Sequence, residues 1–178
     1  MIAKTVLLGM NNPDPVDAFR AQKKTGSGYR LLSYMNEYLK PQKIKIDAFD
    51  FERMFDRQNM LDEAEWSVVR AKERKRETLR RLAGRRVIIC GNGVAFTLGL
   101  NVQSDFEWFT SLGIEWCKIP HPSGVNRLYN IEHYRISTGA LLWKELQNGV
   151  LWHCEHKMNH EHFLTNRWPE EKWSYPPT

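Results

Sequence analysis

The sequence predicts an α/β fold in which short buried strands alternate with helices. Apolar runs of strand length recur along the chain, and segments of helix length lie between them. Each run ends in a turn rich in Gly, Pro or Asn. The first run, residues 6–8, is short and apolar, as is typical of a buried parallel strand, and Gly9, Pro13 and Pro15 prevent it from continuing.

The next segments predict a helix and a second strand. Apolar residues of segment 26–40 recur at three- and four-residue spacing, and Pro41 follows, so we expect a helix that ends there. Residues 44–49 alternate between apolar and polar side chains, which predicts a second, shorter strand. Residues 62–86 predict a long helix whose exposed face is basic.

The second half of the chain continues the alternation. Residues 85–93 predict a strand that ends in a glycine turn, and residues 114–124 predict another that ends in a proline-containing loop. Residues 95–100 show no clear pattern. The segment 136–149 predicts the closing helix, which starts near Ser137 or Thr138 and ends at Gly149.

Length and composition indicate one domain, and the charge is compatible with an anionic partner. A chain of 178 residues forms one core, so we expect an α/β domain over residues 1–150, with a tail rich in His, Trp and Pro over residues 151–178 packed on or extending it. The formal net charge of +5 suits a nucleic acid but does not require one. No apolar stretch approaches the roughly 20 residues of a membrane span. We expect a monomeric cytoplasmic or nucleoid-associated protein that binds no membrane.

The basic helix of residues 62–86 has two interpretations. Its cations are Arg70, Lys72, Arg74, Lys75, Arg76, Arg80, Arg81, Arg85 and Arg86. They are suited to phosphate contacts, but a helix rich in charge is usually a solvated face. Both interpretations stay open at this point.

Two loops that follow strands carry the candidate chemistry. The loop after the first strand contains Asn11, Asn12 and Asp14, and the loop after the last strand begins His121, Pro122, Ser123. Because parallel strands end at the same edge of a sheet, we expect these side chains in one cleft if the two strands are neighbours. A lone histidine after a strand is more often structural, so the pairing of the two loops is what favours a functional site.

These two loops resemble motifs of the uracil-DNA glycosylase superfamily. That family has a first motif of the type G-x-N-P or G-x-D-P-Y after its first strand and a second of the type H-P-S or N-P-S after its last. Residues 124–127 continue as Gly, Val, Asn and Arg, the order of the mismatch-specific and single-strand-selective branches. Residues 25–32 and 87–99 are similar to further segments of the family, so the resemblance spans roughly residues 5–145. It implies a three-layer α/β/α fold around a central, mainly parallel four-stranded sheet.

The resemblance also implies a reaction and the residues that perform it. Such an enzyme cleaves the N-glycosidic bond of uracil, or of a related modified or mismatched pyrimidine, and leaves an abasic site in DNA. His121 would donate a hydrogen bond to the leaving base, and a first-motif Asn would position the water. The family usually has one residue between Gly and Asn-Pro, whereas three residues separate Gly9 and Pro13 here. Asn12 keeps the Asn-Pro pair and is preferred, whereas Asn11 keeps the distance from Gly9.

The other expected roles belong to residues that surround the base and the DNA strand. Asp14 is a nearby carboxylate suited to accept the proton of the water. Gly9 and Met10 would line the base pocket, Phe19 would stack on the flipped base and Asn59 would read its edge. Ser123 would bind a phosphate and Val125 would act as a wedge, with Gly124, Asn126 and Arg127 contacting DNA beside it.

No metal or other cofactor is expected. Cys154, His156, His160 and His162 have the chemistry of zinc ligands but match no standard finger, and three cysteines cannot provide a four-cysteine iron–sulfur cluster. The alternative to a glycosylase is a weak or inactive relative that binds DNA or a modified base without excision. A more distant alternative is an α/β enzyme that acts on free nucleotides.

Overall fold

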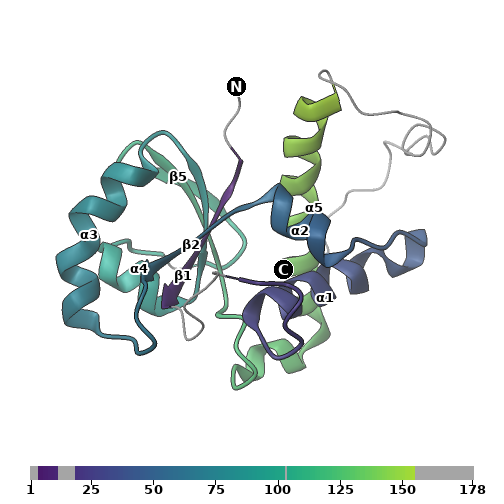
Figure 1. Ribbon diagram of the computed structural model, residues 1–178, viewed down its shortest axis with the longest axis horizontal. Helices are drawn as coiled ribbons and strands as arrows, with labels where there is room; N and C mark the ends of the chain where they lie inside the picture. The colour runs from purple at the N-terminus through teal and green to yellow at the C-terminus, as the bar shows by residue number, and fades with distance from the viewer. Residues whose placement is uncertain (1–3, 12–18, 103, 155–178) are drawn as a thin grey trace.

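The computed structural model describes residues 4–11, 19–102 and 104–154. Within them the helices and strands alternate along most of the chain, as the sequence predicts (Figure 1). The elements are β1 (Val6–Asn11), α1 (Ser27–Leu39), η1 (Lys40–Gln42), α2 (Ala48–Met54), β2 (Asp56–Leu61), α3 (Val68–Leu82), β3 (Arg86–Cys90), α4 (Asn92–Leu98), β4 (Trp108–Ser111), β5 (Ile114–Ile119), η2 (Arg127–Asn130) and α5 (Glu132–Cys154).

The strands form one mostly parallel sheet in the order β2-β1-β3-β5-β4. β2, β1, β3 and β5 are parallel, and β4 is antiparallel to β5 at the edge. The prediction of an α/β fold with a mainly parallel sheet is therefore confirmed. The expected number of strands was wrong, because the sheet has five strands rather than four.

Helices cover both faces of the sheet. Figure 1 shows α1, α2 and α5 on one side and α3 and α4 on the other. Side chains of successive strand residues point to opposite faces, which divides the core into two clusters. Leu7 and Ile88 pack with α1 and α5, whereas Leu8 and Ile89 pack with α3 and α4. This alternation explains why the central strands contain runs of consecutive apolar residues.

The strand expected at residues 44–49 is wrong. Residues 44–47 connect η1 to α2, and the second strand is β2, which starts at Asp56. The side chain of Asp47 accepts a hydrogen bond of 2.8 Å from the backbone N–H of Asp50, which starts α2. β2 was missed because most of its side chains are polar and only half-buried, which conceals the usual apolar pattern.

The fifth strand, β4, was missed because a two-residue turn joins it to β5. Leu112 and Gly113 have φ angles of 56° and 69° and connect the paired residues Ser111 and Ile114. Two positive φ angles match the right-handed twist of a tight hairpin, but the turn lacks the usual Asn-Gly signal. The sequence therefore gave little indication of this edge strand.

The closing helix is longer than predicted. α5 starts at Glu132 rather than near Ser137, and it continues past Gly149 to Cys154. Gly139 lies inside it, where a Cβ atom would meet the backbone carbonyl oxygen of Tyr34 on α1. This glycine lets α1 and α5 cross closely, so here glycine serves helix packing rather than a helix end.

α5 is also attached to the sheet through a buried carboxylate. Glu145 is buried, and its Oε1 lies 2.9 Å from Nη2 of Arg86, the first residue of β3. Its Oε2 accepts a hydrogen bond of 2.8 Å from the Thr5 hydroxyl. These bonds satisfy the buried charge and fix α5 at the amino end of the sheet. Within the described ranges, no helix is long and apolar enough to cross a membrane.

Candidate functional site

The expected site residues follow the carboxyl ends of the parallel strands. The expectation depended on β1 and β5 being neighbours, but β3 lies between them. The two loops therefore flank the end of β3, where Gly91 starts the turn into α4. Residues 12–18 lie outside the described residues, so the structure does not place Asn12 and Asp14.

Gly91 makes room for His121. Its backbone has φ 98° and ψ 160°, a region that essentially only glycine occupies. A Cβ atom at this position would lie 2.8 Å from the Cβ atom of His121. Any other residue would therefore strain the backbone and displace the histidine.

His121 is held as a partly buried imidazole. Burial lowers the pKa of His121 from its ordinary value of 6.5. The ring is therefore neutral at pH 7, with one nitrogen that donates a hydrogen bond and one that accepts. The backbone oxygen of His121 accepts a hydrogen bond of 2.9 Å from the side-chain amide of Asn126. The histidine thus has a fixed backbone and an uncharged side chain.

Phe19 and Asn59 converge on Gly9. A Cβ atom on Gly9 would overlap the Oδ1 atom of Asn59 and would lie 2.8 Å from Cζ of the Phe19 ring. Asn59 is on β2, the neighbour of β1, in register with Gly9. Among the described residues, the Asn59 side-chain amide has no hydrogen-bond partner. An aromatic ring and an unpaired amide therefore meet above a residue without a side chain.

The backbone of Phe19 is also constrained. Its φ angle is 53°, which is uncommon for a residue with a large side chain. A Cβ atom on Gly28, in the first turn of α1, would overlap the backbone carbonyl of Phe19. Gly28 therefore lets α1 press on the Phe19 backbone and fix the aromatic ring beside Gly9.

Met10 lies beside the start of α4. A Cβ atom on Gly93 would be 3.1 Å from Cε of Met10 and 4.0 Å from the ring of Trp66. Lys118, which is buried on β5, donates to Asn92 Oδ1 at 2.8 Å and pairs with Asp105 Oδ1 at 2.8 Å. These contacts hold α4 at the end of β3, between the loops that follow β1 and β5.

The loop after β5 is held by hydrogen bonds within it and is exposed at its tip. The Asn126 side chain donates to the backbone oxygen of His121, and its Oδ1 accepts a hydrogen bond of 3.1 Å from the backbone N–H of Leu128. The Tyr129 hydroxyl donates to the Pro120 carbonyl at 2.8 Å. Val125 is 88% exposed at the tip. The Asn126 side chain therefore forms hydrogen bonds within the loop, whereas the Val125 side chain faces solvent.

Arg30 lies against this loop. A Cβ atom on Gly124 would overlap the guanidinium group of Arg30, which comes from the first turns of α1. Among the described residues, that group has no hydrogen-bond or ion-pair partner. The adjacent Ser123 is half-buried, and Arg127 is exposed at the start of η2. A cation and a hydroxyl therefore lie beside the exposed tip.

The side chain of Asn11 already makes one hydrogen bond to the protein. Its Nδ2 donates a hydrogen bond of 2.6 Å to the carbonyl oxygen of Ala64, in the connection from β2 to α3. Its Oδ1 is left as an acceptor. The structure thus gives Asn11 an anchoring contact, while its alternative, Asn12, lies in the part of the chain that is not described.

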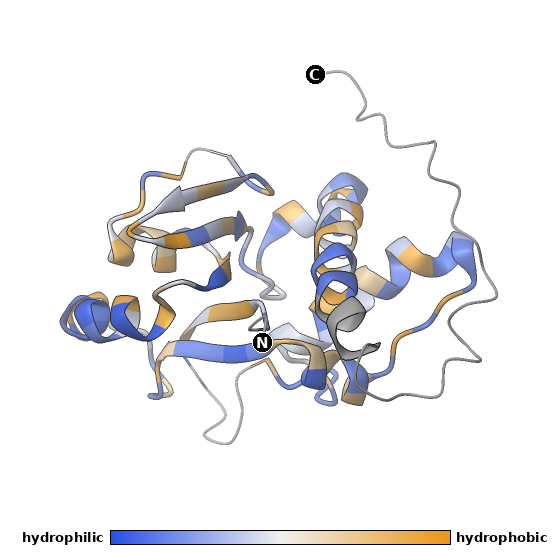
Figure 2. Ribbon diagram, turned by 90° about the horizontal axis from the view of Figure 1, so that it is seen from above, coloured by the Kyte–Doolittle hydropathy of each residue, from blue (hydrophilic) through white to orange (hydrophobic). Residues whose placement is uncertain are grey.

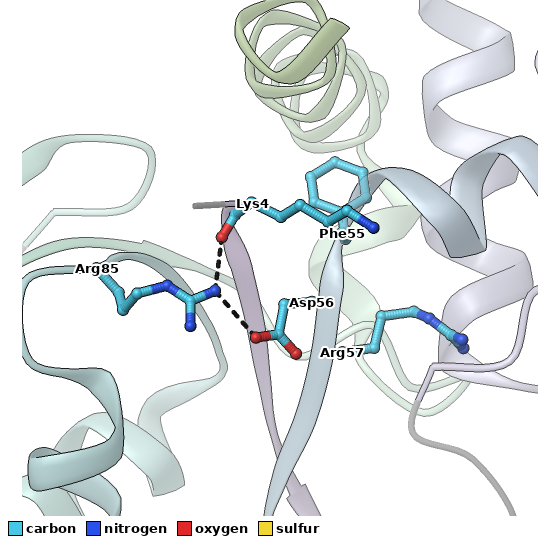
Figure 3. Close-up of a pocket in the computed structure, with 5 residues that line it drawn as sticks. All are labelled: Lys4, Phe55, Asp56, Arg57 and Arg85. Atoms are coloured by element: carbon cyan, nitrogen blue, oxygen red, sulfur yellow. Dashed lines mark hydrogen bonds and ion pairs between the residues drawn. The ribbon is translucent and has the colours of Figure 1, made fainter. Parts of the chain in front are cut away.

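A surface depression lies at the opposite edge of the sheet. It has a volume of about 480 Å³ and is lined by Lys4, Phe55, Asp56, Arg57 and Arg85. Figure 3 shows Arg85 between the Lys4 carbonyl and the Asp56 carboxylate. Nη2 of Arg85 donates to both groups at 2.9 Å. These residues precede or begin their strands, so the depression is separate from the loops that contain His121. Its Arg85 joins the amino ends of β1 and β2.

Sequence reasoning missed several residues of the site. Arg30 and Gly28 lie in a segment of the resemblance but were not assigned a role, and Lys118 lies in an apolar run. Gly91 was recognised only as a turn. A glycine directly after a buried strand was the available signal for Gly91, whereas the contact of Arg30 with Gly124 depends on tertiary structure.

The comparisons with known proteins add no assignment. No protein-family model matches this sequence, and no curated protein matches it. Across the three described ranges, no group of His, Cys, Asp or Glu side chains is arranged to hold a metal ion. The tail histidines His156, His160 and His162 lie outside those ranges.

Proposed function

We propose that this protein is a DNA glycosylase of the uracil-DNA glycosylase type, which removes uracil or a related modified or mismatched pyrimidine flipped out of DNA. The proposal starts from the resemblance of the two loop motifs. The finer fold assignment, a three-layer α/β/α domain of that family, belongs to the same proposal. The protein acts on DNA as a monomer and needs no cofactor.

The convergence of Phe19 and Asn59 at Gly9 is the observation that carries this proposal. The two residues come from separate segments of the chain, and the resemblance assigns both of them to contacts with the base. An extruded pyrimidine needs an aromatic surface on which to stack and a group that both donates and accepts hydrogen bonds at its edge. A phenylalanine ring and an unpaired amide side chain supply these two functions.

His121 suits the departure of the base. When the N-glycosidic bond breaks, the electron pair goes to the base, the sugar becomes cationic and water adds to C1′. A donor placed near a carbonyl oxygen of the base stabilises the developing negative charge. His121 is kept neutral by burial, so it offers one N–H without bringing a buried charge. Its role is analogous to that of an oxyanion-hole donor.

The loop after β5 suits contact with the DNA backbone. Val125 is exposed and acts as the wedge that fills the space of the extruded base. Ser123 and Arg30 bind the adjacent phosphate, and Arg127 contributes a further cation. Gly124 leaves room for Arg30 beside the loop, and Asn126 maintains the shape of the loop rather than contacting DNA.

The remaining roles rest on the sequence. Asn12, or alternatively Asn11, positions the attacking water, and Asp14 accepts its proton. The hydrogen bond from Asn11 to Ala64 favours the assignment to Asn12, because it already holds the Asn11 amide group in a structural contact.

Excision from labelled oligonucleotides tests the proposal. The panel carries uracil, hydroxymethylated pyrimidines or mismatched thymine in single- and double-stranded DNA, and alkali reveals abasic sites. We expect cleavage with wild-type protein and a loss of about 100-fold or more with His121→Ala. The matched control is His133→Ala, because His133 is exposed on α5.

Each result of this assay has a clear meaning. Cleavage that depends on His121 but not on His133 supports the glycosylase and identifies its base. DNA binding without cleavage of any substrate contradicts it and favours the binding protein. Hydrolysis of free nucleotides with no action on DNA contradicts it in favour of a nucleotide-processing enzyme.

A further inference from the structure

The positive charge of the protein is concentrated on α3. This helix carries seven Lys or Arg residues and two Glu residues, a net charge of +5 that equals the formal net charge of the whole chain. Figure 2 shows α3, on the same side as in Figure 1, mostly in the colour of hydrophilic residues. An acidic or polyanionic partner is therefore attracted to this helix before any other.

Part of this charge is not used by the fold. Arg70 is paired with Glu63, and Arg74 lies 3.4 Å from Glu77. Arg76 and Arg80, one helical turn apart, are exposed and have no ion-pair partner among the described residues. Two cations on one stripe of α3 are therefore available for contacts with a partner.

An exposed aromatic ring lies beside another cation of α3. Phe96 on α4 is 68% exposed, and Nζ of Lys72 on α3 is 5.5 Å from the centre of its ring. Lys75, one turn further along α3, reaches α4 at its end, where a Cβ atom on Gly99 would lie 2.7 Å from its Nζ. We call Lys72, Lys75, Arg76, Arg80 and Phe96 the α3–α4 face.

The α3–α4 face begins at the candidate site. α4 starts directly after Gly91, which contacts His121, and Gly93 of α4 approaches Met10 at the end of β1. Phe96 is one helical turn beyond Asn92 on the same helix. A chain that leaves the site along α4 therefore reaches the aromatic ring and then the cations of α3.

We propose that the α3–α4 face binds a single-stranded segment of DNA that continues from the candidate site. An unpaired base stacks on the Phe96 ring, while Lys72, Arg76 and Arg80 contact its phosphates. This inference rests on the proposed function, because it takes the bound strand to be the one that enters the candidate site. It goes beyond excision because it assigns a second binding surface and a preference for single-stranded DNA.

The chemistry of this face favours a single strand over a duplex. Phe96 is an exposed ring with a lysine beside it, next to a helix rich in Lys and Arg. Aromatic rings and basic side chains are the combination by which proteins hold unpaired bases and their backbone without reading the sequence. In a duplex the bases are already stacked on each other and leave no free face for Phe96. The charge of α3 likewise favours a polyanion over an apolar protein surface.

Binding of an oligonucleotide without a target base tests the inference independently of catalysis. The probe is a fluorescently labelled single strand of about 15 nucleotides that contains no uracil or modified base, read by anisotropy. The variants are Phe96→Ala, Phe96→Tyr and the double variant Lys72→Gln with Arg76→Gln. The matched control is Phe49→Ala, because Phe49 on α2 is 59% exposed and also has a cation, Arg53, 5.1 Å from its ring centre.

We expect Phe96→Ala to weaken binding of the single strand about tenfold and Phe96→Tyr to restore it to within about twofold. The double variant should weaken binding and lower its salt dependence by about one unit or more of the log–log slope. Phe49→Ala should bind as the wild type does, and the affinity for duplex DNA should change little with Phe96→Ala.

Equal behaviour of Phe96→Ala and Phe49→Ala overturns the inference, as does an equal loss of duplex and single-strand binding. Thermal unfolding of each variant identifies any folding defect, and rescue by Phe96→Tyr separates stacking from folding. The two proposals fail separately. If no substrate is excised but Phe96→Ala still weakens single-strand binding, the proposed reaction fails while the binding surface stands.

Discussion

Gly91 and His121 lie so close together that position 91 has no room for a side chain. A Cβ atom on Gly91 would lie 2.8 Å from the Cβ atom of His121. Gly91→Ala should therefore combine backbone strain with displacement of the histidine. We expect a loss of about 3 kcal/mol in the free energy of unfolding and a strong loss of excision. Urea denaturation and the oligonucleotide assay measure the two effects.

Gly113→Ala is the control for that prediction. Gly113 also has a positive φ angle, 69°, but no atom lies within 4 Å of its Cβ position. The Gly113→Ala variant should lose only about 1 kcal/mol in the free energy of unfolding and should keep its excision activity. Equal losses in the two variants would show that the contact with His121 is not important.

The lowered pKa of His121 predicts that acid destabilises the protein. The unfolded chain binds a proton at His121 near the ordinary pKa of 6.5, whereas the folded protein binds it only at lower pH. Stability is therefore full above about pH 6.5 and decreases as the pH falls through the folded pKa. His121→Gln removes this contribution, so its free energy of unfolding should fall less between pH 7.5 and 5.5. The same pH dependence in both proteins would contradict the burial of His121.

Asn59→Leu should lower kcat/KM on a uracil-containing oligonucleotide about 100-fold, because an apolar side chain of similar shape cannot hydrogen-bond the base edge. The control is Gln58→Leu on the same strand, because the Gln58 amide donates to Asp56 at 2.9 Å, beside β1 but away from Gly9. Steady-state kinetics on both variants checks this. Normal kinetics of the Asn59→Leu variant would exclude a role of Asn59 in base recognition.

Arg30→Gln should weaken DNA binding and lower its salt dependence by about one unit of the log–log slope, as expected for the loss of one phosphate contact. Arg53→Gln is the control, since Arg53 is exposed at the end of α2, near the opposite edge of the sheet. Titrations at several salt concentrations measure the slope. Parallel slopes for Arg30→Gln and wild type would show that this guanidinium contacts no phosphate.

Glu145→Gln tests the attachment of α5 separately from the site. The change leaves Arg86 without one of its two carboxylates, and we expect a loss of about 3 kcal/mol in the free energy of unfolding. Below the melting temperature, excision should be unchanged, because Glu145 lies at the amino end of the sheet. Urea denaturation should therefore show a loss of stability while the oligonucleotide assay shows unchanged excision. A parallel loss of stability and excision would contradict the purely structural role of Glu145.

Strong local patterns made the core of this fold predictable from the sequence. The runs around Ile88 and Cys117 are apolar because both faces of their strands are buried, and the glycine and proline residues after them mark real strand ends. β2 could not be predicted this way. It owes its position to pairing with β1, and its polar side chains carry little strand signal.

The candidate site was predictable only in part for a similar reason. His121 and Ser123 stand out because they follow a strong strand, and Asn59 and Phe19 were suggested only by the resemblance. The contacts of Gly91 with His121 and of Gly124 with Arg30 arise between segments far apart in the sequence. No periodicity within either segment reports such a contact.

The residues that hold the loop after β5 in shape are different from the residue exposed at its tip, Val125. Asn126 and Tyr129 fix its backbone through hydrogen bonds to His121 and Pro120, and none of these bonds involves the side chain at the tip. Selection can therefore exchange the tip residue at little cost in folding. Residue 125 can therefore change the chemistry that the loop presents to a partner while the hydrogen-bonded backbone beneath it stays the same.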